Sequence, residues 1–94
     1  MVLKFEKKFY RDLRKISDKE LVASILPQII LNVKQAKNVY EINNLKQLEK
    51  YTVRYRIKIK LDEKRTYRIG LVIRGNVVWF VRLLHRRKIY KEFP

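Results

Sequence analysis

The chain has 94 residues and carries 24 Lys and Arg against nine Asp and Glu, a formal charge of +15 at pH 7. With 47% hydrophobic residues and only two glycines and two prolines, it suits one compact domain spanning residues 1–94. It has no cysteine, which excludes disulfides and thiolate chemistry, and one histidine is too few for an ordinary zinc site. We therefore expect neither a metal nor a cofactor.

The positive charge is concentrated in the second half of the chain. Residues 50–94 hold fourteen Lys and Arg against three Asp and Glu, and residues 1–49 hold ten against six. Such an excess is typical of proteins that bind nucleic acid, an acidic protein or an anionic membrane. No apolar run approaches the roughly 18 residues of a membrane span, and the first residues lack a secretory signal. We expect no membrane association and a cytoplasmic protein.

The first half of the chain predicts a short edge strand and two helices. Residues 1–4 suit the strand, and apolar residues at helical spacing predict a helix over about residues 5–15. Ser17-Asp-Lys-Glu20 has the spacing of a capping box, so a second helix should begin near Asp18. Pro27 then predicts a kink, or two shorter helices that meet at Leu26.

Two apolar residues of the second helix are poorly covered in this pattern. Leu31 points away from the inner face and Ile30 lies at its margin. Residues 38–51 mix Asn, Lys and Glu with scattered apolar residues, which predicts a loop held by a few apolar anchors.

Three strands are predicted after residue 52. In the first, about residues 53–60, cationic and apolar residues alternate, so one face carries Arg54, Arg56, Lys58 and Lys60. The second places Arg68 and Arg74 on the same side, with a depression at Gly70. Gly75-Asn76 predicts a tight hairpin, and residues 77–84 are apolar almost throughout, as in a strand covered on both faces. Like charges two residues apart repel one another, which favours an anion lying across this face.

These elements predict an α+β fold. Two N-terminal helices pack on a small, twisted antiparallel sheet, and a short C-terminal helical turn follows the last strand. The uncovered face of the sheet should be basic and concave, because sheets twist and Gly70 carries no side chain.

Four segments in this order carry a resemblance to a known family. They are YEINNLKQL at 40–48, YRIKI at 55–59, YRIG at 67–70 and VRLLHRRKIYKEF at 81–93. The chain resembles the RelE/ParE superfamily of toxins from type II bacterial toxin–antitoxin systems, in its RelE-like branch. The resemblance implies a β-α-α-β-β-β fold of the microbial ribonuclease type and neutralisation by a cognate acidic antitoxin. It also implies one of two activities, cleavage of messenger RNA in the ribosomal A site or poisoning of DNA gyrase.

The chemistry of RNA cleavage suits the cations of the uncovered face. A ribose 2′-hydroxyl attacks its own phosphate once a base withdraws its proton, cations stabilise the added charge, and a donor protonates the leaving oxygen. Arg56, Lys58 and Arg68 lie on this face of adjacent strands. The alternation of side chains along the last strand would place Arg82 on the same face. By resemblance, Arg56, Lys58, Arg68 and Tyr90 match positions where RNA-cleaving members carry working residues.

His85 and Tyr90 are the candidates for proton transfer. Histidine is the side chain whose unperturbed pKa lies near neutrality. A lone histidine is more often a surface residue than a catalyst, and the place of His85 in the cationic cluster makes the two interpretations about equal. Tyr90 either stacks on a base or packs the tail on the sheet, and Phe93 is expected to pack. Glu41 and Glu49 could supply a base, although solvation in a loop is the better interpretation for both. The other cations expected to bind RNA are Arg54, Lys60, Arg74, Arg86 and Arg87.

We predict a metal-independent, ribosome-dependent endoribonuclease toxin that cuts messenger RNA. The alternatives are a gyrase poison, which needs no acid–base pair, and a non-catalytic RNA-binding or autoregulatory module. The antitoxin should contact the basic sheet and an apolar groove at Ile30 and Leu31. One departure from the family is clear, because its usual glycine-containing turn before the central strand is replaced by Glu49-Lys50.

Overall fold

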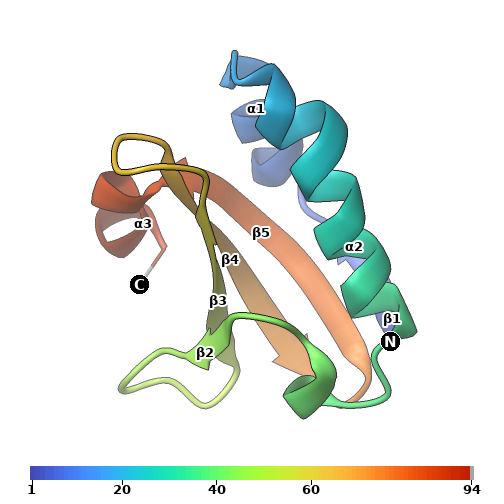
Figure 1. Cartoon of the computed structure of the whole chain (residues 1–94). Helices are drawn as coiled ribbons and strands as arrows, with labels where there is room; N and C mark the ends of the chain where they lie inside the picture. The colour runs from blue at the N-terminus through green and yellow to red at the C-terminus, as the bar shows by residue number, and fades with distance from the viewer. Residues whose placement is uncertain (94) are drawn as a thin grey trace.

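The computed structural model describes residues 1–93, with the backbone alone for residues 90–92. Its elements are β1 (Val2–Phe5), α1 (Lys7–Lys15), a π-helical turn η1 (Leu21–Ile25), α2 (Leu26–Gln35), a 3-10 turn η2 (Val39–Glu41), β2 (Leu45–Gln47), β3 (Arg54–Lys60), β4 (Thr66–Arg74), β5 (Val77–His85) and α3 (Arg86–Glu92). The five strands form one sheet in the order β1-β5-β4-β3-β2. The helices α1 and α2 lie on one side of this sheet, and α3 lies on the other (Figure 1).

The predicted α+β class is confirmed, with two differences in the sheet. β1 pairs with β5 in parallel, so the sheet is mixed, whereas β2, β3, β4 and β5 form antiparallel pairs. β2 lies within the stretch predicted to be a loop and adds a short edge strand beside β3. No helix within residues 1–93 is both long and apolar enough to cross a bilayer.

The second helix begins at an aspartate. The Asp18 carboxylate accepts a hydrogen bond from the Leu21 backbone N–H at 3.2 Å, which makes Asp18 rather than Ser17 the capping residue. Glu20, the expected partner in a capping box, instead pairs with Arg65 at 2.7 Å. The predicted junction at Leu26 is confirmed, because the Leu26 N–H donates to the Leu21 carbonyl in η1 and α2 continues from there with Pro27 in its first turn.

The main core fills the space between the sheet and the helices α1 and α2. Phe80 of β5 is fully buried between Phe5 and Phe9, with ring centroids 4.7 and 5.6 Å away. The predicted alternation in β3 is confirmed, because Ile57 and Ile59 are buried in this core. The intervening cations of β3 therefore point to the opposite face, which we call the open face.

A second, smaller core holds α3 on the open face. It consists of buried Leu84, Ile89 and Phe93, against which Leu48, Val72 and Val81 pack. Trp79 lies on the same side, half-buried beside Val72, its partner in β4. The predicted C-terminal turn is thus a seven-residue helix docked by a few apolar contacts.

Candidate functional site

The open face carries six cations on two neighbouring strands. We call this group the cationic face: Arg54, Arg56, Lys58 and Lys60 of β3, with Arg68 and Arg74 of β4. Lys58 lies directly opposite Arg68, and Arg56 lies opposite Gly70. Side chains in such positions start only about 5 Å apart. This register brings Arg56, Lys58 and Arg68 together as predicted.

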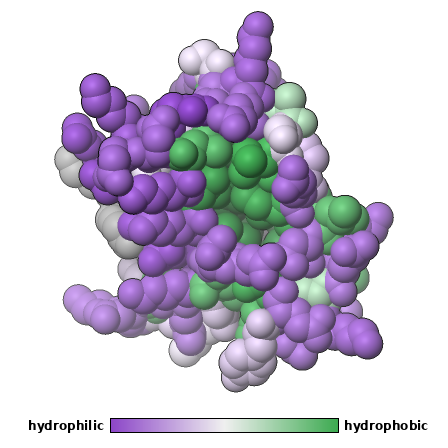
Figure 2. All heavy atoms as spheres, in the orientation of Figure 1, coloured by the Kyte–Doolittle hydropathy of each residue, from purple (hydrophilic) through white to green (hydrophobic). Residues whose placement is uncertain are grey.

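In Figure 2, hydrophilic residues cover most of the visible surface, around an apolar patch between the sheet and the helices.

The cationic face is not uniformly available for an anion. Lys60 at the end of β3 forms an ion pair with Glu63 at 2.9 Å. Arg74 lies at the other end of the sheet, near Trp79. The Arg56 Nε is buried and has no hydrogen-bond partner within the described part of the chain. A buried guanidinium N–H without a partner is costly, so a rotation of this side chain that brings the Nε to a phosphate oxygen would be favourable.

The depression predicted at Gly70 is present but occupied. A Cβ at Gly70 would lie 2.6 Å from the ring of Phe93, so only glycine leaves room for this ring on the sheet. Phe93 is 4% exposed, as expected for a packing residue. The Arg54 guanidinium lies 5.7 Å from the Phe93 ring centroid and 4.8 Å from that of Tyr51. The concavity of the open face is therefore filled at Gly70.

Arg82 was expected to join Arg56, Lys58 and Arg68 on the open face, and this prediction is wrong. The register between β4 and β5 shifts at Gly70/Leu71, so Val81 and Arg82 share one position opposite Gly70. Arg82 turns to α1, where its guanidinium donates to both Asp12 oxygens at 2.8 and 3.1 Å. The same carboxylate accepts from the Leu83 N–H, which β1 is too short to reach. Asp12 is 6% exposed, and Arg82 serves this buried contact at the sheet edge.

His85 lies at the junction between β5 and α3, with both ring nitrogens in contact with backbone. Its Nδ1 accepts from the Arg87 N–H at 3.4 Å, and its Nε2 lies 3.1 Å from the Lys64 carbonyl oxygen. In this arrangement Nδ1 is the acceptor and Nε2 faces an oxygen that can only accept. The ring also lies edge-on to Tyr67 at 5.8 Å. His85 therefore begins α3 and ties it to the β3–β4 hairpin.

Other predicted residues lie around α3. Arg86 and Arg87 are exposed in its first turn and line a pocket of about 310 Å³ with His85. Tyr90 belongs to α3, but its side chain lies outside the described residues.

One ion-pair cluster was missed by sequence reasoning, because its members are far apart in the chain. Arg65, in the β3–β4 hairpin, pairs with Asp18 at 2.9 Å, with Glu20 at 2.7 Å and with Asp62 at 3.3 Å. The Arg65 guanidinium lowers the pKa of Asp18, and its backbone N–H lowers the pKa of Asp62. These acids in turn raise the pKa of Arg65, while burial raises the pKa of Tyr67. The network neutralises Arg65 and anchors the β3–β4 hairpin to the start of the second helix.

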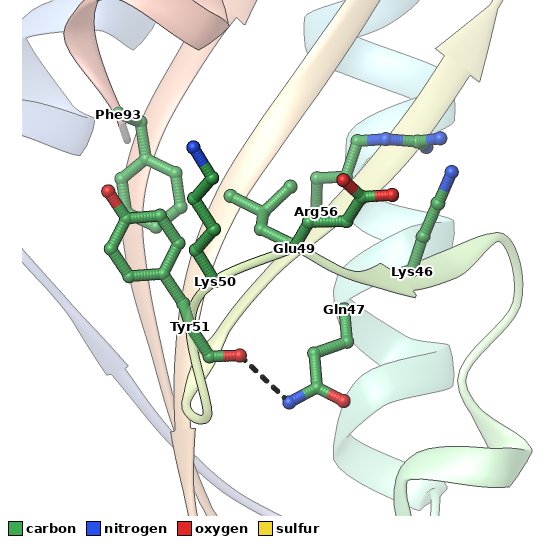
Figure 3. A pocket seen from close by; sticks show the side chains of 8 residues that line it. Lys46, Gln47, Glu49, Lys50, Tyr51, Arg56 and Phe93 are labelled. Atoms are coloured by element: carbon green, nitrogen blue, oxygen red, sulfur yellow. Dashed lines mark hydrogen bonds between the residues drawn. The ribbon is translucent and has the colours of Figure 1, made fainter.

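A pocket of about 350 Å³ was also missed, although the unusual Glu49-Lys50 turn lies in its wall. It is lined by Lys46, Gln47, Leu48, Glu49, Lys50, Tyr51, Arg56 and Phe93 (Figure 3). Lys50 has φ 71°, in the left-handed region that favours glycine. Lysine therefore adopts a backbone conformation that glycine would adopt at lower cost. The turn lies between β2 and β3 and borders the cationic face at Arg56.

Comparison with known proteins decides the family. The chain is 33% identical over 98 residues, covering both sequences completely, to Toxin RelE3 of Methanocaldococcus jannaschii. The chain belongs to the RelE family of toxins. A search against models of protein families gave no match.

Solved structures agree with this membership. The RelB-RelE antitoxin-toxin complex from Methanococcus jannaschii superposes with a TM-score of 0.64 and 30% identity, over 97% of this chain and 99% of that one. The isolated E. coli RelE toxin gives a TM-score of 0.59 at 17% identity, over 97% and 92% of the two chains, and supports the RelE fold alone.

Proposed function

We propose that this RelE toxin is a ribosome-dependent endoribonuclease that cuts messenger RNA without a metal. The observation that supports the proposal most is the pairing of Lys58 with Arg68 beside Arg56 on the open face. Three cations in one neighbourhood suit a phosphodiester, whose charge grows as the transition state forms. Their phosphate contacts supply affinity that falls as salt is raised.

The reaction follows from the chemistry of RNA. The 2′-oxygen attacks phosphorus, the bond to the 5′-oxygen breaks, and a 2′,3′-cyclic phosphate forms. The 2′-hydroxyl loses its proton and the leaving oxygen gains one. Arg56, Lys58 and Arg68 stabilise the charge on phosphate in this proposal. Proton transfer falls to His85 or Tyr90, and His85 must first exchange one of its two backbone contacts.

A non-catalytic RNA-binding module is the second candidate. The observation that favours it is again His85, because both ring nitrogens are engaged with backbone. The cations alone bind phosphate without moving a proton. In this case the cationic face still binds RNA, and the RNA remains intact.

Primer extension on translating ribosomes tests the proposal, with wild type, Arg68→Ala, His85→Ala and the control Arg14→Ala. Arg14 is an exposed cation of α1, on the other side of the sheet, so its variant removes the same charge away from the site. Wild type and Arg14→Ala are expected to cut the message, and Arg68→Ala to cut about 100-fold more slowly. Intact message with every protein rejects the nuclease, and inhibition of gyrase supercoiling in its place identifies a gyrase poison.

We propose an acidic antitoxin as the partner, since the structural relative from Methanococcus jannaschii is a RelB-RelE antitoxin-toxin complex. The chain offers the cationic face for its charge and Leu31 of α2, 52% exposed, with half-buried Ile30 beside it for its apolar residues. A pull-down with any short acidic protein encoded beside this chain tests this. Leu31→Glu should weaken capture, and Ala23→Glu, which adds the same charge at an exposed position eight residues before Leu31, is the control for charge.

A further inference from the structure

The pocket beside Arg56 combines two kinds of wall. The rings of Tyr51 and Phe93 stand on one side, and Arg56 and Lys46 stand on the other (Figure 3). The Glu49 carboxylate lies on the side of the cations, across from the rings. An aromatic surface facing charged and polar groups is the arrangement with which proteins bind single-stranded RNA bases.

The aromatic wall is held in place before any ligand arrives. Phe93 is fixed in the hollow above Gly70, and the Arg54 guanidinium lies over both rings. The Tyr51 ring is anchored through its backbone, because the Gln47 side-chain amide donates to the carbonyls of Tyr51 and Thr52, each at 3.0 Å. Tyr51 is 37% exposed, so part of its ring remains open to a ligand. A rigid aromatic platform binds a flat base with little loss of entropy.

Glu49 determines which bases the pocket can take. An ionised carboxylate only accepts hydrogen bonds. Adenine, guanine and cytosine each carry an exocyclic amino group that can donate to it. Uracil has no amino group, and its only donor on this edge, the N3–H, lies between two carbonyl oxygens that repel a carboxylate.

Arg56 connects this pocket to the cationic face. Its side chain lines the pocket, its Nε is buried without a hydrogen-bond partner among the described residues, and its strand position faces Gly70 beside Lys58 and Arg68. A nucleotide whose phosphate contacts Arg56 can therefore place its base in the pocket.

We propose that this pocket is a nucleobase subsite that accepts an amino-bearing base of RNA through Glu49 and Tyr51 and discriminates against uracil. The inference rests on the proposed function for its substrate class, RNA. Gln47 is a positioning residue, which acts through the turn that carries Tyr51.

Cytidine and uridine monophosphate are matched probes, because their pyrimidine rings differ at one edge only. Titration of each into the ¹⁵N-labelled protein should shift the amides of residues 47–51, with CMP bound about tenfold more tightly than UMP. Glu49→Gln, whose amide can also donate, should bring the two affinities within about twofold of each other. Tyr51→Ala should weaken both nucleotides by about tenfold, through lost stacking. Glu6→Gln, which removes the same charge at an exposed position outside this pocket, should behave as wild type.

Equal binding of CMP and UMP to wild type, or a preference for CMP that survives in Glu49→Gln, overturns the proposal. Shifts confined to residues outside 46–56 and Phe93 overturn it as well. Primer extension separates this failure from that of the nuclease. If the message stays intact while CMP is preferred at residues 47–51, the nuclease falls and the subsite stands. If the message is cut while CMP fails to shift these residues, the subsite falls and the nuclease stands.

Discussion

The two faces of the sheet differ in composition, although the same strands build both. β3 gives Ile57 and Ile59 to the main core and Arg56 and Lys58 to the open face. The face under α1 and α2 buries many large apolar side chains, whereas the open face buries three among the described side chains and leaves cations beside them. Stability should therefore come mainly from one face and ligand binding from the other. Changes matched across the sheet test that division.

The largest difference is expected between two phenylalanines. Phe80→Ala, in the main core, should lower the free energy of unfolding by about 3–5 kcal/mol, because it leaves a cavity among Phe5, Phe9 and their neighbours. Phe93→Ala should cost less, because α3 can separate from the sheet without opening the main core. Urea unfolding measures both variants. Equal costs would show that the open face carries as much stability as the covered one.

The edge contact between Asp12 and Arg82 should rank next. Asp12→Ala leaves the Arg82 guanidinium and the Leu83 N–H without this carboxylate. It should therefore lower the free energy of unfolding by about 2–4 kcal/mol. Glu6→Ala, at an exposed position just before α1, should stay within about 0.5 kcal/mol of wild type. Thermal and urea unfolding compare the two variants. A small effect of Asp12→Ala would show that this contact contributes little to stability.

Gly70→Ala should act on the open face alone. The added methyl group would overlap the Phe93 ring. The free energy of unfolding should therefore fall by about 1–3 kcal/mol, and α3 should separate from the sheet. Hydrogen exchange should then speed up in residues 86–93 while the amides of β1 keep their protection. In a Phe93→Ala background the same change should cost much less, which a double-mutant cycle measures. Additive costs would contradict direct contact between these two residues.

Lys50→Gly should stabilise the turn between β2 and β3. Lysine at φ 71° is strained, and glycine relieves that strain while adding freedom to the unfolded chain, so the net gain should be about 0.5–1 kcal/mol. Gln47→Gly, at an extended position of β2, is the contrasting change and should destabilise. A loss of stability in Lys50→Gly would show that the lysine side chain matters more than the backbone strain.

The smallest effect on stability is expected from lowering the pH, through the protonation of Asp18 and Asp62. Asp18 and Asp62 have a lowered pKa in the folded protein, so the stability they contribute is present above the unfolded-state value of about 3.8 and is lost as the pH falls through the lowered pKa. Asp18→Asn should flatten the dependence of the melting temperature on pH below about 4. Asn43→Asp, an exposed change elsewhere, should leave the slope as in wild type.

Local periodicity predicted the faces of the sheet, and non-local contacts limited the prediction of the site. Ile57 and Lys58 were assigned correctly, because side chains in a strand alternate with a period of two. Arg82 was assigned wrongly, because a register shift breaks that period and no residue type announces it.

The ties of Arg65 to Asp18 and of Phe93 to Gly70 depend on how distant segments meet. The hollow at Gly70 could be predicted from the glycine itself, whereas its occupant depended on the path of α3. The pocket at residues 46–51 gave one signal, the replacement of the family's glycine turn by Glu49-Lys50.

The position of Trp79 has a practical consequence. It is the chain's single tryptophan, and it lies half-buried on the side of the sheet that faces α3. Intrinsic fluorescence will therefore report changes on the open side of the sheet, including quenching by an oligonucleotide bound there. Global unfolding also exposes this side chain, so circular dichroism recorded in parallel separates the two events.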